Sequence, residues 1–161
     1  MAIEKVKEYL SQWGRDGDIL EFATSSATVA LAAQALGTEP GRIAKTLSFR
    51  LPEGCVLIVA AGDAKVDNKK FKACFGCKAK MLSPGEAVFF TGHAIGGVCP
   101  FAIERDDVAV VLDESLRRFD TVYPACGSSN SAICLTLSEL EAYSRAEGWA
   151  DVCKLPEQET L

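Results

Sequence analysis

The fold is decided by the stretch Thr46-Leu47-Ser48-Phe49-Arg50-Leu51-Pro52-Glu53-Gly54-Cys55-Val56-Leu57-Ile58-Val59-Ala60. Residues 46–51 and 56–60 are short runs with the composition of strands, and residues 52–54 between them have the composition of a turn. Two strands that a short turn joins pair in the antiparallel direction. The stretch therefore predicts a β-hairpin.

The segments on either side of this hairpin alternate between helical and strand patterns. Apolar spacing and capping residues predict helices over residues 3–13, 28–36, 68–75, from 83 onward, and 138–147. Apolar runs predict strands over residues 19–22, 108–112, 121–123 and 132–135, with 108–112 as a buried central strand. Glycines and a proline predict a loop over 92–101, and the polar tail after Cys153 is expected to fray.

The chain has the length and composition of one globular domain. Its 161 residues are 48% hydrophobic, and neither a repeat nor a linker divides them. We expect a single domain over residues 1–161, of class α/β (α+β), in which helices pack on a mixed, mostly antiparallel sheet.

The apolar segments and the cysteines indicate where the protein works. No run of 18 apolar residues is present, which argues against a membrane span, and the first residues lack the apolar region of a secretion signal. Seven cysteines, an odd number, fit a reducing compartment better than a disulfide framework. We therefore expect a cytoplasmic protein without a membrane partner.

The charge is unevenly distributed along the chain. The net charge of −5 argues against broad binding to DNA or other nucleic acid. Residues 63–80, however, contain six lysines and two aspartates, which gives this segment a local charge of +4. Such a segment is either a local phosphate-binding patch or a solvated helix face, and the sequence leaves both open.

Several common kinds of site lack the residues that they need. Cys74 and Cys77 form a C-x-x-C, but a structural zinc needs four ligands, and His93 is the only histidine. No G-x-S-x-G, G-x-G-x-x-G or P-loop pattern is present. We therefore predict neither a metal nor a cofactor, and the cysteine pair stays without an assigned role.

Two features have no evident structural need. Lys45 stands immediately before the first predicted strand of the hairpin. The loop that contains Gly96, Gly97 and Pro100 would let main-chain groups approach a ligand closely. Either feature could also be structural, because lysines often flank strands and glycines form tight connections.

Five segments in chain order resemble one known family. They are residues 35–49 with an LG and an I-x-K-T-L-x-F pattern, 62–71 with GD, 91–101 with TG, GG and PF, 112–116, and 122–127. Together they resemble the YbaK/EbsC family of prolyl-tRNA synthetase-associated editing domains, most strongly over residues 20–140. The resemblance implies that family's fold.

The resemblance also implies an activity. It is hydrolysis, in trans, of the ester between a wrong amino acid and the terminal adenosine of a tRNA, commonly tRNA for proline charged with Cys, Ala, Ser or Thr. A synthetase cannot reject such amino acids by binding alone, because one methylene is worth only about 1–3 kcal/mol. The implied partners are aminoacylated tRNA and prolyl-tRNA synthetase. A non-catalytic module that binds the aminoacylated end is the alternative.

Site residues follow by matching the family's motifs. Lys45 would contact the phosphate or carbonyl region of the substrate, and the main chain of Gly96 and Gly97 would complete the catalytic group. The substrate-binding residues would be Thr46, Asp63, Val98, Cys99, Pro100, Phe101, Gly127 and Ser128. The tRNA-binding residues would be Lys65, Lys69, Lys70 and Lys72. Lys45-Thr46 resembles the members that act on cysteinyl-tRNA, whereas residues 125–130 lack the Ser-Gly-Gly of that type.

Overall fold

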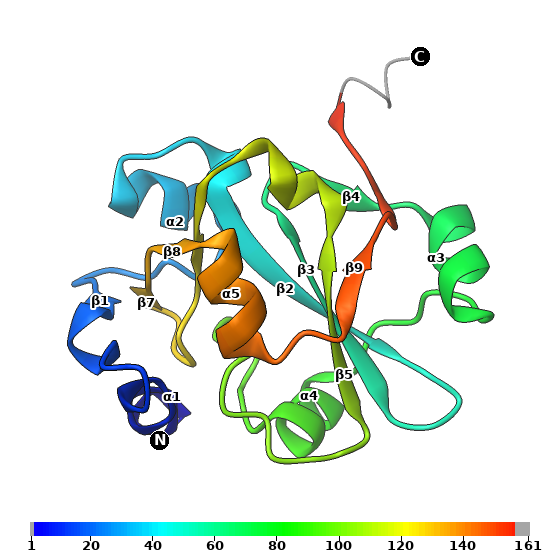
Figure 1. Ribbon diagram of the computed structural model, residues 1–161, viewed down its shortest axis with the longest axis horizontal. Coiled ribbons are helices and arrows are strands. Elements are labelled where there is room, and N and C mark those ends of the chain that lie inside the picture. Colours follow the sequence, from blue (N-terminus) through cyan, green and yellow to red (C-terminus); the bar gives the residue numbers. More distant parts are fainter. Residues whose placement is uncertain (1, 157–161) are drawn as a thin grey trace.

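The computed structural model describes residues 2–156 as a curved mixed sheet with helices around it (Figure 1). Six strands pair in the order β8-β6-β2-β3-β5-β9. Their bounds are β2 Ile43–Arg50, β3 Cys55–Ala61, β5 Val108–Asp113, β6 Thr121–Pro124, β8 Leu135–Thr136 and β9 Gly148–Ala150. Two small sheets pair β1 (Leu20–Glu21) with β7 (Ser131–Ala132) and β4 (Lys65–Val66) with β10 (Cys153–Lys154).

The predicted hairpin forms the middle of the six-stranded sheet. β2 and β3 pair antiparallel from Ala44 opposite Ala61 to Arg50 opposite Cys55. Every residue of β3 is buried, because strands flank it on both sides and helices cover the sheet. Burial of this apolar strand provides much of the hydrophobic stabilisation of the core.

Five α-helices are described in residues 2–156, and capping residues fix the starts of several of them, although α1 ends at Ser11, two residues before its predicted end. α1 is Ala2–Ser11, α2 Val29–Leu36, α3 Asn68–Phe75, α4 Pro84–Thr91 and α5 Leu137–Ser144. The side chain of Thr28 caps α2, that of Asp67 caps α3, and Ser83 with Glu86 forms a capping box on α4. Gly37 ends α2 in the left-handed conformation, as predicted.

Some predicted boundaries are wrong. β2 begins at Ile43, so Lys45 lies inside the strand rather than before it. The run 132–135 is not one strand, because it contributes to β7 and β8 in different sheets. α5 ends at Ser144, where Arg145 takes φ 54°, instead of continuing to Glu147.

The C-terminal segment also differs from the prediction. Cys153 pairs with Val66 in β10, so the chain is ordered beyond the point where fraying was expected, and the remainder of the predicted tail, from residue 157, lies outside the described residues. β5 is an interior strand between β3 and β9, but only part of it is buried. The sequence pattern predicts neither β10 nor β9, and β9 pairs only with Val111–Asp113, the second half of β5.

The class of fold is confirmed. The sheet is mixed, and four of the seven strand pairings in residues 2–156 are antiparallel, although three of the five within the six-stranded sheet are parallel. None of the helices described there is long and apolar enough to cross a membrane.

Candidate functional site

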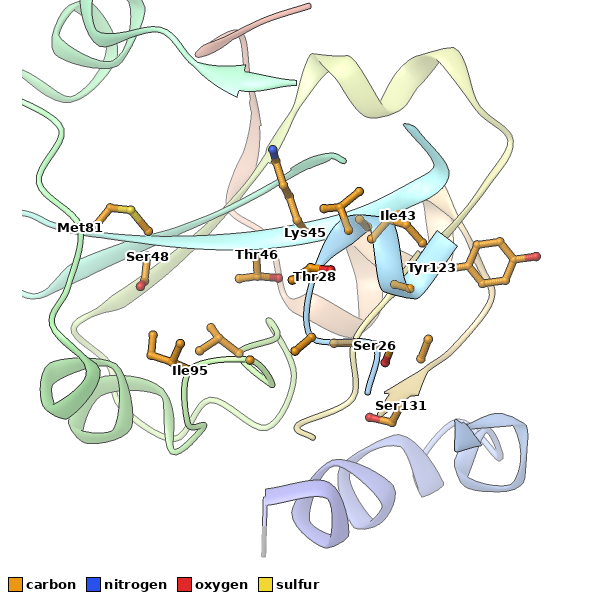
Figure 2. Close-up of a pocket in the computed structure, with 18 residues that line it drawn as sticks. Ser26, Thr28, Ile43, Lys45, Thr46, Ser48, Met81, Ile95, Tyr123 and Ser131 are labelled. Atoms are coloured by element: carbon orange, nitrogen blue, oxygen red, sulfur yellow. The ribbon is translucent and has the colours of Figure 1, made fainter. Parts of the chain in front are cut away.

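A cavity of about 220 Å³ lies alongside β2 (Figure 2). The segment that leads into α2 and the loop that follows α4 form its other walls, together with residues around β6 and β7. The residues that line it are Ser26, Ala27, Thr28, Val29, Ala32, Ile43, Ala44, Lys45, Thr46, Ser48, Met81, Ile95, Gly96, Val98, Tyr123, Ala125, Ser131 and Ala132.

The chemistry of this lining is unusually simple. Small apolar side chains and hydroxyl groups predominate, and no carboxylate, imidazole or thiol lines the cavity among the described residues. Several hydroxyls already have partners: Thr28 accepts a hydrogen bond from the Leu31 amide, and Ser131 accepts one from Ser128. The cavity can therefore bind and orient a ligand, but its side chains supply no evident general base.

Thr46 is an exception to this pattern of paired hydroxyls. Its Oγ1 is buried and has no hydrogen-bond partner among the described residues. A buried hydroxyl without a partner costs about 1–3 kcal/mol. Rotation about χ1 exchanges the hydroxyl with the methyl group, so this side chain can present either group to the cavity.

Lys45 is one of the β2 residues that line the cavity, but its side chain leaves the strand on the other side. Figure 2 shows it pointing away from Thr46 and Ser48, as alternation along a strand requires. The ammonium donates to the main-chain carbonyl oxygen of Gly62 at 3.3 Å and to that of Ala64. Burial lowers the pKa of Lys45, which nearby Asp63 partly offsets. In this structure Lys45 holds the turn between β3 and β4.

This turn is in contact with the cavity wall. A β-carbon on Gly62 would lie 2.2 Å from the Pro40 carbonyl oxygen and 2.6 Å from a methyl group of Val29. Val29 lines the cavity. Lys45 is thereby connected to the cavity through Gly62 and Val29, without placing its charge inside.

The glycine loop divides into a cavity side and a packing side. Gly96 lines the cavity and has φ 96°, a conformation that favours glycine. Gly97 does not line it: a β-carbon there would lie 2.8 Å from the Ser128 amide nitrogen and 2.9 Å from the carbonyl carbon of Gly127. The Gly97 amide donates to the Ala94 carbonyl. Gly97 therefore packs the loop against residues 127–128.

The comparisons with known proteins match this region. A model of the aminoacyl-tRNA editing domain matches residues 23–143, well over half of the chain and a range that includes every residue lining the cavity. The chain belongs to the aminoacyl-tRNA editing domain family. The Bacillus subtilis protein YwhH, for which no activity is named, is 56% identical over 156 residues, 96% of this chain and 98% of YwhH.

Other editing-domain relatives are more distant in sequence. The proline–tRNA ligase of Thermotoga maritima is 30% identical over 91 residues, which are 56% of this chain and only 15% of the ligase. A solved structure described as a candidate trans-editing enzyme for prolyl-tRNA synthetase superposes with a TM-score of 0.85 at 30% identity, covering 95% of this chain and 97% of that one. The hypothetical protein APE2540 superposes with 0.79 at 29% identity, covering 93% and 99%.

The structure of this editing domain brings only some predicted site residues together. Of the predicted residues, Lys45, Thr46, Gly96 and Val98 line the cavity. Other predicted residues lie behind it: Gly127 and Ser128 support the loop, and Cys99, Pro100 and Phe101 are buried. Asp63 does not line the cavity either; both its oxygens accept hydrogen bonds from Arg118, which lower the pKa of Asp63.

His93 anchors the end of the glycine loop in the core of the editing domain. Its ring is buried, and Nε2 lies 2.8 Å from the Phe101 carbonyl oxygen and 3.4 Å from the Cys99 sulfur. Because a carbonyl only accepts, Nε2 carries the proton in this assignment. Burial lowers the pKa of His93 and raises that of Cys99 to about 12, so both groups are neutral and structural.

The four lysines that were predicted to bind tRNA do not form a uniform group. Lys65, Lys69 and Lys72 are exposed. Lys70 instead donates to the Asp151 carboxylate at 3.0 Å and to the Cys153 carbonyl oxygen at 2.9 Å, which ties α3 to the C-terminal segment. Lys70 thus has a structural function in this editing domain.

The cysteine pair is not part of the site. Cys74 and Cys77 lie at the end of α3, and both are free thiols. In residues 2–156 the structure contains no group of three or more His, Cys, Asp or Glu side chains that could hold a metal ion.

Sequence reasoning missed most of the residues that line the cavity. Ser26, Met81, Ile95, Tyr123 and Ser131 were assigned no functional role, since each is ordinary in its local context. The cluster of hydroxyl residues before α2 was interpreted only as a source of a helix cap, and Thr28 is indeed that cap. No local signal shows that these segments meet.

Proposed function

We propose that this protein hydrolyses the ester of a mischarged tRNA in trans, with tRNA for proline that carries Cys, Ala, Ser or Thr as its substrate. One observation carries the proposal: the cavity beside β2 is formed entirely by residues of the matched editing domain. The likeness to a structure described as a candidate trans-editing enzyme supports action on a separate tRNA rather than within a synthetase.

The size and lining of the cavity suit the amino acids in question. Its walls are largely alanine, glycine, serine and threonine, and its volume is about 220 Å³. Pockets that enclose drug-sized ligands measure about 300–1,000 Å³. A cavity of this size admits a small aminoacyl group, while larger side chains would clash with Val29, Ile43 and Val98. The cavity thus limits the size of the aminoacyl group that it admits.

The proposed mechanism uses the substrate's own groups. Water adds to the ester carbonyl, the bond to the ribose oxygen breaks, and the products are a free amino acid and a tRNA with both terminal hydroxyls. Because the lining described above includes no carboxylate or imidazole, the neighbouring ribose hydroxyl assists the attacking water and takes part in the proton transfer. Main-chain groups at Gly96 and Val98 orient the aminoacyl group.

Lys45 belongs to this proposal as a positioning residue. Its ammonium fixes the carbonyl oxygens of Gly62 and Ala64, and Gly62 packs against Val29 in the cavity wall. Loss of the ammonium would leave two carbonyls without their donor and would loosen that wall. Lys45 thus acts on the reaction through the shape of the cavity.

The exposed lysines supply the proposed contact with the tRNA backbone. Lys65, Lys69 and Lys72 are exposed on a protein with a net charge of −5, so we expect few phosphate contacts and weak binding. Prolyl-tRNA synthetase is the proposed source of the substrate. The expected site of action is the cytoplasm, where aminoacyl-tRNA is present and thiols are reduced.

A deacylation assay tests the proposal. Purified protein is mixed under single-turnover conditions with tRNA for proline charged in turn with alanine, cysteine, serine, threonine and proline. We expect release of alanine, cysteine, serine or threonine well above the uncatalysed rate, whereas the prolyl ester should stay intact. Tight binding of a mischarged tRNA without release would instead support a non-catalytic binding module, and neither binding nor release would refute both.

A further inference from the structure

Two exposed apolar side chains lie at one end of the cavity. Of the large apolar residues that are exposed in residues 2–156, only Met81 and Ile95 line it, with 58% and 57% of their surface exposed. Figure 2 shows both at the end marked by Ser48. Single exposed apolar residues are common on protein surfaces, but two from separate segments at one cavity mouth indicate a binding surface.

The backbone holds both side chains in this position. On either side of Met81, the Lys80 carbonyl accepts from the Arg50 amide at 2.8 Å and the Leu82 amide donates to the Ser48 carbonyl at 3.1 Å. Met81 is therefore fixed beside β2. Ile95 lies within the turn that the hydrogen bond from Gly97 to Ala94 closes. These main-chain bonds fix the backbone from which each side chain starts, and both side chains are exposed at the mouth of the cavity.

The volume of the cavity indicates what this surface contacts. About 220 Å³ accommodates an aminoacyl group and part of a ribose, but not a complete aminoacyl-nucleoside. The nucleobase must then lie outside the cavity. Proteins commonly hold an extruded base between apolar or aromatic side chains, and methionine adapts its shape to such a surface.

We propose that Met81 and Ile95 hold the terminal nucleobase of the aminoacylated RNA between them at the cavity mouth. The inference rests on the proposed function and adds a base-binding subsite to it. Other exposed apolar residues fit less well. Phe89 stacks on the Arg105 guanidinium, 4.2 Å from its ring centre, and the cavity lining includes none of Leu20, Leu31, Val88 and Phe89.

The experiment compares two minimal substrates. One is adenosine carrying a 2′(3′)-alanyl, cysteinyl, seryl or threonyl ester, and the other is the same ester on a methyl riboside that has no base. The variants Met81→Ala and Ile95→Ala are measured beside Leu31→Ala, which removes an exposed apolar side chain away from the cavity.

Each cavity variant should raise KM for the adenosine ester about tenfold. KM for the base-free ester should change much less than KM for the adenosine ester, and Leu31→Ala should match the wild type on both substrates. An equal change on both substrates, or no change on either, would overturn the subsite. The proposed function fails separately, when the wild type hydrolyses neither ester nor any mischarged tRNA.

Discussion

Replacement of Gly97 by alanine isolates the contact that positions the glycine loop. If the glycines of this loop only let the main chain approach a ligand, added bulk would cost activity alone, but the structure predicts that stability falls as well. The new β-carbon would lie 2.8 Å from the Ser128 amide nitrogen and 2.9 Å from the Gly127 carbonyl carbon, both main-chain atoms that cannot move independently. Overpacking of this kind costs about 1–3 kcal/mol.

The expected change in Tm follows from the size of the domain. For a domain of this length each kcal/mol shifts Tm by about 2–4 °C, so Gly97→Ala should lower Tm by roughly 2–12 °C. Gly97 does not have a positive φ, so alanine is allowed there and the steric contact is the cause. Deacylation should fall too, because Gly96 and Val98 line the cavity.

Gly85→Ala is the matched control for thermal unfolding followed by circular dichroism. No atom lies within 4 Å of a β-carbon at Gly85, which is in α4, so alanine should be neutral or stabilise by up to about 1 kcal/mol. If Gly97→Ala unfolded at the wild-type temperature, the close packing of the loop on residues 127–128 would be refuted.

Three further substitutions test separate parts of the site. Lys45→Ala should reduce single-turnover deacylation at least about 100-fold and also lower Tm, because it removes the donor to Gly62. Wild-type turnover would show that Lys45 does not position the cavity wall. Thr46→Val should raise Tm by about 2–12 °C, because it removes a buried hydroxyl without a partner, whereas Thr46→Ser should not. A lower Tm for Thr46→Val would contradict this. Asp63→Asn should destabilise at pH 7 in urea unfolding. Because Arg118 lowers the pKa of Asp63 from 3.8, this difference should be complete above pH 3.8 and disappear as the pH falls further; a difference that is independent of pH would contradict the ion pair.

Local signals in the sequence predict much of the fold. The caps at Thr28 and Asp67 and the capping box at Ser83 depend on residues within one turn, and all three helices begin where these residues predict. β9 and β10 are only three and two residues long and form by pairing with distant strands. Their sequences carry no alternation that could reveal them.

The site was harder to predict from the sequence, because it also depends on contacts between segments that are far apart in the chain. Thr46, Gly96 and Val98 were found because the resemblance covers their motifs, and they do line the cavity. Alternation along β2 places Lys45 and Thr46 on opposite faces of the strand, but the sequence does not show which face borders the cavity. The direction of the Lys45 side chain, away from the cavity, was therefore not predicted. The cavity itself arises where segments more than 100 residues apart meet, such as Ser26 and Ser131.

Occlusion of the cavity tests most directly the claim that hydrolysis takes place there. Ala27 lines the cavity and is exposed, so Ala27→Trp can fill its opening without disturbing the core, while Ala30→Trp places the same side chain on an exposed position of α2 outside the lining. Single-turnover deacylation of the preferred mischarged tRNA is measured for both variants, after thermal unfolding has shown that their Tm values are equal. The account predicts at least about a tenfold loss for Ala27→Trp and wild-type turnover for Ala30→Trp. Equal rates for the two variants would contradict it.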